Sequence, residues 1–362
     1  MNKILVVTNG NIGDFIMASS ALKLLRLSAP SAKITLIVSI KVKDFIENLS
    51  LADKIIYTDF SFAKSALLQR FDQIIWFFKN YFKLKKEKFD SCIFLDHSRF
   101  FAKAVVLLGI KNLIGPSTWW CGDNAANPNI KSLNYIVKLP INSDLTHLSY
   151  RYQTIIRNYF DSYNMSMPSL PQTSLDADKK AVKLLNKTKK YSIAFSFRGD
   201  NIKGNKKIYP SKYIIEIIKQ TAKEFDADFY FLGTKDSFDE AQKIKEELSN
   251  LSINNLCAKT RLTDLQSIFK YLDLLICVDT GIIHIAATTA VKIIGLYGAN
   301  LYNSIPMSHK AIVLGVKESC SPCHYSRTVL KIPCAYGDSP KCLSDIKPQA
   351  VICAIKKQLT VI

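Results

Sequence analysis

The chain has 362 residues, of which 48% are hydrophobic, and a formal net charge of +19. This length accommodates two globular domains, and the composition excludes a disordered chain. The charge suggests a nucleic-acid partner, but 41 of the 49 basic residues are lysines spread along the chain and no nucleic-acid-binding motif is present, so we expect none. Its apolar runs are too short for a membrane-spanning helix or a signal peptide, so we expect a cytoplasmic protein.

Apolar strands and amphipathic helices alternate in the first half of the chain. The predicted strands cover 3–7, 34–38, 54–57 and 91–95, and the first two predicted helices cover 14–28 and 41–49. This alternation indicates a parallel sheet that is covered by helices on both sides.

Residues 71–89, FDQIIWFFKNYFKLKKEKF, form a third helical pattern with lysines at its C-terminal end. Ile74, Phe78 and Phe82 fall on one face of this helix, beside Ile75. Such a helix either lies on an anionic bilayer or packs in the core and leaves a basic end in solvent. We expect the packed arrangement, and the general basic charge is then either a solvated surface or suited to an anionic membrane or acceptor.

A polar, proline-containing stretch near 161–178 predicts a linker, after which the alternation restarts. Further strands are predicted at 192–197, 229–232, 274–278 and 293–297, with helices at 211–225, 237–249 and 263–271. We therefore expect an N-terminal Rossmann-like domain over 1–165, a linker over 166–185, a C-terminal Rossmann-like domain over 186–344 and a C-terminal helix over 345–362. The sequence leaves open whether that last helix packs back on the N-terminal domain.

Residues 272–289, LDLLICVDTGIIHIAATT, are the most informative segment for function. An apolar run predicts a buried strand that ends at Asp279-Thr280-Gly281, and a helical pattern follows. The start of such a helix presents unpaired N–H groups and the positive end of the helix dipole to an anion. His284 lies one turn inside the helix, where its ring can face the same point. The segment therefore predicts a site for a diphosphate.

Gly10-Asn11-Ile12-Gly13-Asp14 follows the first predicted strand. This spacing is not the GxGxxG fingerprint of dinucleotide binding, which argues against a nucleotide-dependent dehydrogenase or epimerase. Asp14 is either an N-cap of the following helix or a carboxylate that takes a proton from a hydroxyl nucleophile.

Segment 196–210, SFRGDNIKGNKKIYP, is a lysine-rich loop after the first strand of the second half. Lys207 lies three residues before Pro210, where a helix is predicted to start. A cation at this point can reach a leaving diphosphate. The alternative is an exposed loop without a role in the chemistry.

The order of Gly10-x-x-Gly13-Asp14, Lys207-x-x-Pro210 and Asp279-Thr280-Gly281-x-x-His284 resembles glycosyltransferase family 9, the ADP-heptose:lipopolysaccharide heptosyltransferases and their relatives. The resemblance covers nearly the whole chain and is densest over 190–300. It implies a GT-B fold, in which two Rossmann-like domains face each other across a cleft. It also implies donor binding mainly by the C-terminal half, and metal-independent transfer with inversion.

The resemblance carries roles to individual residues. Asp14 resembles the family's general base and Lys207 its phosphate-contacting lysine, while Asp236 loosely matches an acid that faces the nucleoside. The residues expected to bind the donor are Gly13, Asp236, Asp279, Thr280, Gly281 and His284. The chain departs from the family pattern at four places that bear on sugar and base preference: Ser20 for proline, a longer Lys207 loop, Tyr209 for tryptophan, and Gly298-Ala299-Asn300 for a Gly-Pro turn.

Contacts to the acceptor are expected in the N-terminal half. Arg99, Lys41 and Lys43 follow predicted strands, where they suit a phosphorylated sugar. Each is alternatively an ordinary surface residue.

Nine cysteines in a cytoplasmic chain argue against a disulfide framework. Five are predicted to be small core residues: Cys92, Cys121, Cys257, Cys277 and Cys353. The other four are Cys320, Cys323, Cys334 and Cys342, which either hold a structural Zn or Fe ion, remain free thiols or form a redox disulfide. No cofactor is expected to be required for catalysis.

The leading prediction is an inverting enzyme that moves heptose from ADP-heptose to a lipopolysaccharide inner-core acceptor at the inner face of the cytoplasmic membrane. Asp14 removes the acceptor proton, and Lys207, His284 and the helix start stabilise the departing diphosphate. The alternatives keep the fold and the reaction type but use a UDP-hexosamine donor or a protein hydroxyl acceptor. A non-enzymatic, basic surface-binding protein is the remaining alternative.

Overall fold

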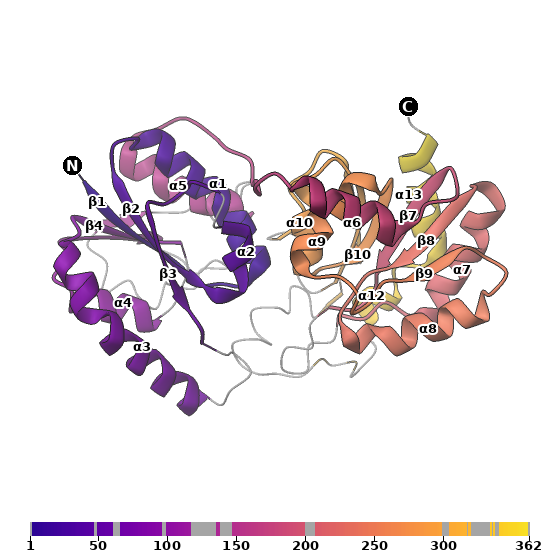
Figure 1. Cartoon of the computed structure of the whole chain (residues 1–362), viewed down its shortest axis with the longest axis horizontal. Coiled ribbons are helices and arrows are strands. Elements are labelled where there is room, and N and C mark those ends of the chain that lie inside the picture. The colour runs from indigo at the N-terminus through magenta and orange to yellow at the C-terminus, as the bar shows by residue number, and fades with distance from the viewer. Residues whose placement is uncertain are drawn as a thin grey trace. The chain divides into compact units, whose positions relative to one another are not determined.

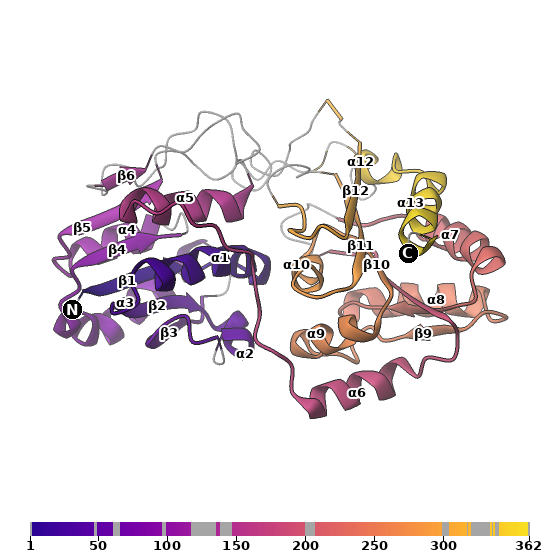
Figure 2. The ribbon, with the colours of Figure 1, turned by 90° about the horizontal axis from the view of Figure 1, so that it is seen from above.

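The computed structural model describes residues 2–46, 49–60, 66–95, 99–116, 135–137, 147–199, 207–298, 304–316, 318–319, 334, 336 and 340–360. The chain forms two compact units, Met1–Pro171 and Gln172–Ile362. Each unit is an α/β structure built on its own six-stranded sheet (Figures 1 and 2). None of the helices in the described ranges combines the length and the apolar character needed to cross a membrane.

The first sheet is parallel throughout and has the order β3-β2-β1-β4-β5-β6. Its strands are β1 (Lys3–Thr8), β2 (Lys33–Ser39), β3 (Lys54–Thr58), β4 (Ser91–Phe94), β5 (Asn112–Pro116) and β6 (Tyr135–Val137). This is the strand order of a Rossmann fold. Strands β2 and β3 are added on one side of β1 and strands β4 to β6 on the other, so the order of the strands reverses between β1 and β4. Ligands of such sheets bind beyond the carboxyl ends of the strands at that reversal.

Two pairs of helices cover the faces of the first sheet (Figure 1). Helices α1 (Ile12–Ser28) and α5 (Leu148–Phe160) lie on one face, and α3 (Ala66–Glu87) and α4 (Arg99–Val106) on the other. A 3₁₀ turn (Ile40–Val42) and the short α2 (Lys43–Ile46) follow β2. At the α1–α5 contact, the Ser20 hydroxyl lies 2.6 Å from that of Ser149, so serine makes a buried polar link where the family pattern has proline.

The expectation that Ile74, Phe78 and Phe82 pack in the core is wrong. These side chains are exposed, whereas Trp76, Phe77 and Leu84 of the same helix are buried against the sheet. Sequence periodicity identified an apolar face correctly, but α3 carries apolar residues on both faces. Its inner face is the aromatic one that meets Phe60 and Phe101.

The second sheet repeats this arrangement. Its strands are again all parallel and have the order β12-β11-β10-β7-β8-β9, so the order of the strands reverses between β7 and β10. The strands are β7 (Tyr191–Ser196), β8 (Ala227–Phe231), β9 (Ile253–Asn255), β10 (Leu274–Val278), β11 (Lys292–Tyr297) and β12 (Ala311–Gly315). Near-continuous Ile, Leu, Val and Phe in the central strands are typical of a sheet that is buried on both faces.

The helices of the second unit again form two layers (Figure 2). On one face lie α7 (Ser211–Glu224), α8 (Phe238–Glu247) and α13 (Pro348–Thr360), and on the other lie α6 (Leu175–Leu185), α9 (Leu262–Tyr271) and α10 (Gly281–Ala287). The described part of this unit also contains two short helical turns, at Lys235–Ser237 and at α12 (Lys341–Ser344).

One expectation about the chain organisation needs correction. The boundary between the units, after Pro171, falls inside the predicted linker 166–185, but much of that range is helix α6. Ser174 caps this helix by accepting a hydrogen bond from the Ala177 amide at 3.2 Å. The C-terminal helix α13 places Val351 and Ile355 in the core of the second unit, so it completes that unit.

Candidate active site

In the second unit, Lys207 and Asp279 form an ion pair. Lys207 Nζ donates to Asp279 Oδ2 at 2.6 Å, and the two side chains are 23% and 10% exposed. Lys207 belongs to the loop after β7, and Asp279 directly follows β10. Because the strand order reverses between β7 and β10, the pair lies where a parallel sheet of this order binds its ligand. The sequence predicted both residues as site residues, and the structure brings them together.

The loop that carries Lys207 is closed at its base by backbone pairing. Arg198 and Ile208 form an antiparallel bridge, the Gly199 amide donates to the Lys207 carbonyl at 2.8 Å, and the Tyr209 amide donates to the Phe197 carbonyl at 2.9 Å. These bonds fix the backbone position of Lys207 relative to the end of β7. The intervening residues, 200–206, lie outside the described ranges.

Gly199 allows this base to approach the turn after β10. A Cβ atom on Gly199 would lie 2.8 Å from Cγ2 of Thr280 and 3.1 Å from Cβ of Lys207. Any side chain at this position would therefore push the lysine and the Thr280 turn apart. The sequence contains no pattern that distinguishes this glycine from a flexible loop residue.

Arg198 and Glu240 were not predicted as part of the site. Arg198 Nη2 donates to Glu240 Oε2 at 2.9 Å, and Ser211 Oγ also donates to this carboxylate, at Oε1. The pair thereby links the loop base to α8 and to the start of α7. A charged residue directly after an apolar strand is a signal for Arg198, but Glu240 lies on a strongly charged helix where nothing marks it out.

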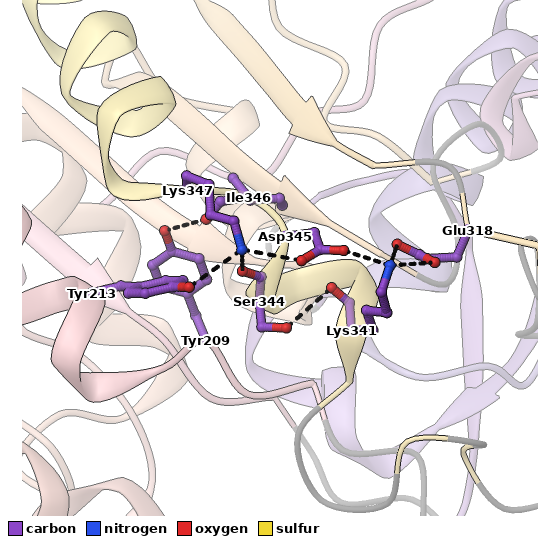
Figure 3. Close-up of polar contacts among 8 residues, drawn as sticks. All are labelled: Tyr209, Tyr213, Glu318, Lys341, Ser344, Asp345, Ile346 and Lys347. Carbon is purple, nitrogen blue, oxygen red and sulfur yellow. Dashed lines mark hydrogen bonds and ion pairs between the residues drawn. The ribbon is translucent and has the colours of Figure 1, made fainter.

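Tyr209 anchors the other end of the loop base (Figure 3). Its ring is buried, and its hydroxyl donates to the Ile346 carbonyl at 2.8 Å. Burial raises the pKa of this hydroxyl well above its usual value, so it remains a hydrogen-bond donor at neutral pH. Tyr209 therefore supports the segment two residues after Lys207, in the position where the family pattern commonly has tryptophan.

The segment that receives the Tyr209 hydrogen bond is itself held by a chain of ion pairs, drawn in Figure 3. Lys341 pairs with Glu318 at 2.9 Å and with Asp345 at 2.7 Å, and Lys347 pairs with Asp345 at 3.1 Å. Hydrogen bonds from Lys341 and then Lys347 lower the pKa of Asp345 to about 2. Ion pairs of this kind contribute little energy singly. They involve both sequence neighbours of Ile346, whose carbonyl accepts the Tyr209 hydrogen bond.

The turn after β10 has the predicted strand–turn–helix form. Thr280 is the N-cap of α10, Gly281 is its first residue, and His284 lies one turn inside it and is 4% exposed. Asp236 lies on the short helical turn after β8, the strand next to β7, and is exposed at the same edge of the sheet. Contacts of His284 and Asp236 to a donor stay predictions.

A cysteine lies beneath this turn but is not a nucleophile. Cys277 is fully buried in β10, and its thiol lies 3.0 Å from the Val278 carbonyl and 3.6 Å from the Thr280 hydroxyl. Burial raises the pKa of this thiol to about 12, so it is protonated at neutral pH. Covalent catalysis through Cys277 is therefore excluded.

In the first unit, Asp14 is the third residue of α1, after β1. Asn11, not Asp14, is the N-cap, and the Asn11 amide donates to Asp14 Oδ2 at 2.8 Å. A Cβ atom on Gly10 would lie 2.5 Å from Asp14 Cβ and 2.8 Å from Oδ2. The carboxylate thus packs against bare backbone and is half-buried at the reversal point of the first sheet. Gly13, another predicted donor-binding residue, is the second residue of α1 and directly precedes Asp14.

One of the predicted acceptor residues contacts Asn11, the N-cap of the helix that carries Asp14. Lys41 Nζ donates to Asn11 Oδ1 at 3.3 Å, so Lys41 reaches the start of α1 from the end of β2. Lys43 is exposed at the first residue of α2, two residues further on. Arg99 begins α4, after β4, and its side chain lies outside the description. Acceptor binding by these three residues stays a prediction.

The cysteines divide into several outcomes. Cys92, Cys257 and Cys277 are buried as predicted, but Cys353 is exposed, because it lies on the outer side of α13. Cys121, Cys320 and Cys323 lie outside the described ranges. Cys334 is partly exposed, and Cys342 is buried in the second core against Gly298. Within the described part of the chain, no three metal-ligating side chains come together, and the predicted metal site is untested.

Comparison with known proteins identifies the family. The family model for glycosyltransferase family 9 (heptosyltransferase) matches residues 78–332, which is more than half of the chain. The chain belongs to glycosyltransferase family 9. It is therefore a glycosyltransferase, and the two Rossmann-like units of the GT-B fold expected from the sequence are confirmed.

Individual relatives agree with this assignment. A putative glycosyltransferase of Haemophilus influenzae is 24% identical over 86% of each chain. Lipooligosaccharide heptosyltransferase 2 of Campylobacter jejuni is 30% identical over 121 residues, 33% of this chain and 35% of that relative, so this match spans about a third of that relative's length.

Two solved structures show the same fold. The E. coli ADP-heptose lps heptosyltransferase II has a TM-score of 0.72 at 18% identity and covers 99% of this chain and 98% of that one. A family 9 glycosyl transferase from Veillonella parvula has a TM-score of 0.75 at 19% identity and covers 99% of this chain and 97% of that one.

Proposed function

We propose that this family 9 enzyme transfers heptose, with inversion, from ADP-heptose to an anionic lipopolysaccharide inner-core acceptor. The carrying observation is the Lys207–Asp279 pair at the reversal point of the second sheet. Relatives named as heptosyltransferases support the sugar, and a solved structure of E. coli WaaC with ADP-2-deoxy-2-fluoro heptose, which shares the fold at a TM-score of 0.65, supports the nucleotide.

On the donor side, Lys207 acts on the leaving group. As the bond from the anomeric carbon to the diphosphate oxygen breaks, its electron pair leaves with ADP and negative charge builds on the phosphates. The Lys207 ammonium neutralises that charge, and Asp279 positions the ammonium by accepting its hydrogen bond. The amides of Thr280 and Gly281 and the buried His284 lie on the same turn and are expected to face the diphosphate.

On the acceptor side, Asp14 acts as the general base. The acceptor hydroxyl gives its proton to the Asp14 carboxylate and attacks the anomeric carbon from the face opposite the diphosphate, which inverts the configuration. The amide of Asn11 holds the carboxylate in place, and Lys41, bound to the Asn11 side chain, is suited to a phosphate group on the acceptor.

No metal is part of this mechanism, because a lysine and backbone amides supply the positive charge. We therefore expect EDTA to leave the transfer rate unchanged, whether or not the late cysteines hold a structural Zn or Fe ion. Loss of transfer that returns with Mg²⁺ or Mn²⁺ would contradict the mechanism.

The central experiment compares Lys207→Ala with Lys212→Ala, a change of an exposed lysine on the neighbouring α7. Removing a group that stabilises developing negative charge costs about 10²–10³-fold in kcat. We expect this loss for Lys207→Ala with ADP-heptose and an inner-core acceptor, and wild-type turnover for Lys212→Ala. Turnover of Lys207→Ala within threefold of wild type, or equal losses in both variants, would refute the assignment.

The same assay separates the alternatives. Transfer from a UDP-hexosamine in place of ADP-heptose changes the donor and keeps the two-residue mechanism. Labelling of a protein hydroxyl in place of lipopolysaccharide changes only the acceptor. We place the reaction at the inner face of the cytoplasmic membrane and expect no nucleic-acid partner. Salt-sensitive DNA binding together with no transfer of any nucleotide sugar would favour the surface-binding alternative.

A further inference from the structure

Helix α3 presents an apolar stripe to solvent. Five large side chains on one side of the helix are between 46% and 80% exposed: Phe71, Ile74, Ile75, Phe78 and Phe82. At 100° per residue these positions fall within an arc of about 100°, so they form one continuous face. Phe82 is 80% exposed. Single exposed apolar residues are common on folded proteins, whereas a contiguous stripe of five is not.

The inner face of α3 fixes the direction of this stripe. Trp76 Nε1 donates to the Tyr57 carbonyl at 2.8 Å, and the Trp76 ring meets Phe60 and Phe101 edge to face. Leu84 is 1% exposed near the C-terminal end of the helix. Because the helix is anchored along its length by these residues, its outer stripe is not needed to hold the unit together.

Basic residues flank the stripe and give it a charge preference. Lys79, Lys83 and Lys86 are exposed on one side of it, Lys85 continues it by one turn, and Lys85 Nζ donates to the Tyr81 hydroxyl at 2.7 Å. Helix α3 carries two acidic side chains, Asp72 near its N-terminal end and Glu87, which is paired with Lys54. The lysines therefore outnumber the carboxylates along the helix, and bulky apolar side chains beside an excess of lysine match the composition of helices that lie in the headgroup region of a bilayer.

The apolar face extends beyond α3. Val106 and Leu107, at the end of α4, are 50% and 62% exposed, and the Leu107 carbonyl accepts from the Tyr81 hydroxyl at 3.4 Å. Lys103 and Lys111 are exposed on either side of these two residues. The ends of two neighbouring helices on the same face of the sheet thus share the pattern of apolar side chains among lysines.

We propose that the outer face of α3, with the end of α4, docks the enzyme on a bilayer surface that contains anionic lipid. Charge decides between this occupant and a second copy of the chain, because pairing two α3 faces would bring like-charged lysines together. This docking surface rests on the proposed function, because the proposed lipopolysaccharide acceptor is lipid-linked and lies at a membrane surface. Binding to vesicles nevertheless needs neither donor nor acceptor, so it is measured independently.

The experiment is co-sedimentation of the full chain with phosphatidylcholine vesicles that contain or lack phosphatidylglycerol. We expect binding only where phosphatidylglycerol is present, and loss of at least about tenfold in the partition constant for Phe78→Ser/Phe82→Ser. A lysine near an anionic surface contributes about fivefold to binding, so Lys79→Gln/Lys83→Gln/Lys86→Gln is expected to lose about a hundredfold. The matched control is Leu175→Ser, which removes an equally exposed apolar side chain from α6 and should bind like wild type.

Three results would overturn the proposal. The first is no vesicle binding by the wild type, and the second is equal binding by the wild type and both α3 variants. The third is a wild-type dimer that dissociates in the phenylalanine variant, together with no vesicle binding. Thermal stabilisation by ADP-sugar serves as the separate readout. Stabilisation of the α3 variants by ADP-sugar shows that they are folded. Lack of stabilisation of the wild type would contradict the proposed function without affecting the vesicle result.

Discussion

Gly10→Ala tests whether the position of Asp14, and not only its charge, drives the reaction. The new methyl group would start 2.5 Å from Asp14 Cβ and 2.8 Å from its Oδ2. Opening the first contact to an ordinary 3.4 Å displaces one of the groups by about 0.9 Å. A misplacement of about 1 Å at a reacting group costs about 10²-fold in rate, so we expect kcat to fall by about a hundredfold.

The assay is steady-state transfer from ADP-heptose, together with thermal stabilisation by ADP. The donor site belongs to the other unit, so stabilisation by ADP should be unchanged. Gly109→Ala is the control, because Gly109 has φ +75° and open space around it and lies before β5, at the sheet edge opposite Asp14. It incurs backbone strain of about 1–3 kcal/mol without touching the site. Equal kcat losses in both variants, or wild-type kcat in Gly10→Ala, would refute the positional argument.

Three further predictions concern the second unit. Burial raises the pKa of Asp228, but hydrogen bonds from Ser252, Thr188 and Lys189 outweigh burial, so the pKa is lowered in the folded state. The carboxylate therefore stabilises the fold at pH values above its unfolded pKa, which is near 4. This contribution is lost as the pH falls below that value. Asp228→Asn should therefore cost about 1–3 kcal/mol in unfolding free energy at pH 7, and the difference should shrink in melts at pH 3. Tyr209→Phe should lower kcat more than it lowers the melting temperature, because it frees the segment that holds Lys207; an unchanged kcat would count against this. In mass spectrometry of the native protein treated with iodoacetamide at pH 8, Cys353 should be alkylated and Cys277 should not.

The strands of both sheets were largely predictable, because parallel strands buried on both faces are short continuous apolar runs. Strand β10 has the predicted bounds, and the other central strands differ by one or two residues. Four strands were missed: β6, β9 and β12 lie at sheet edges, and β5 lies next to the edge strand β6. Strands β6 and β9 have three residues each, and the polar Asn254 and Asn255 interrupt the apolar signal in β9. Helix α6 was missed because its polar sequence resembles a linker, although Ser174 and the acidic first turn mark its start.

Asp14 and Asp279 were placed by the rule that ligands bind at carboxyl strand ends, and Lys207 by its loop after β7 and by the family resemblance. Their roles in the reaction stay predictions, although their positions were predictable from the sequence. The supporting residues were not, because Glu240 reaches the loop base from a helix 42 positions away in sequence. The direction of α3 was not predictable either: periodicity reveals an apolar face but not which of two apolar faces meets the sheet.

The closed base of the Lys207 loop bears on how such enzymes diversify. The bridge between Arg198 and Ile208 and the hydrogen bond between Gly199 and Lys207 hold the two ends of this loop together. We therefore expect substitutions at positions 200 to 206 to leave the Lys207 backbone in place, so that related enzymes can differ in this stretch without losing the lysine proposed to meet the leaving group.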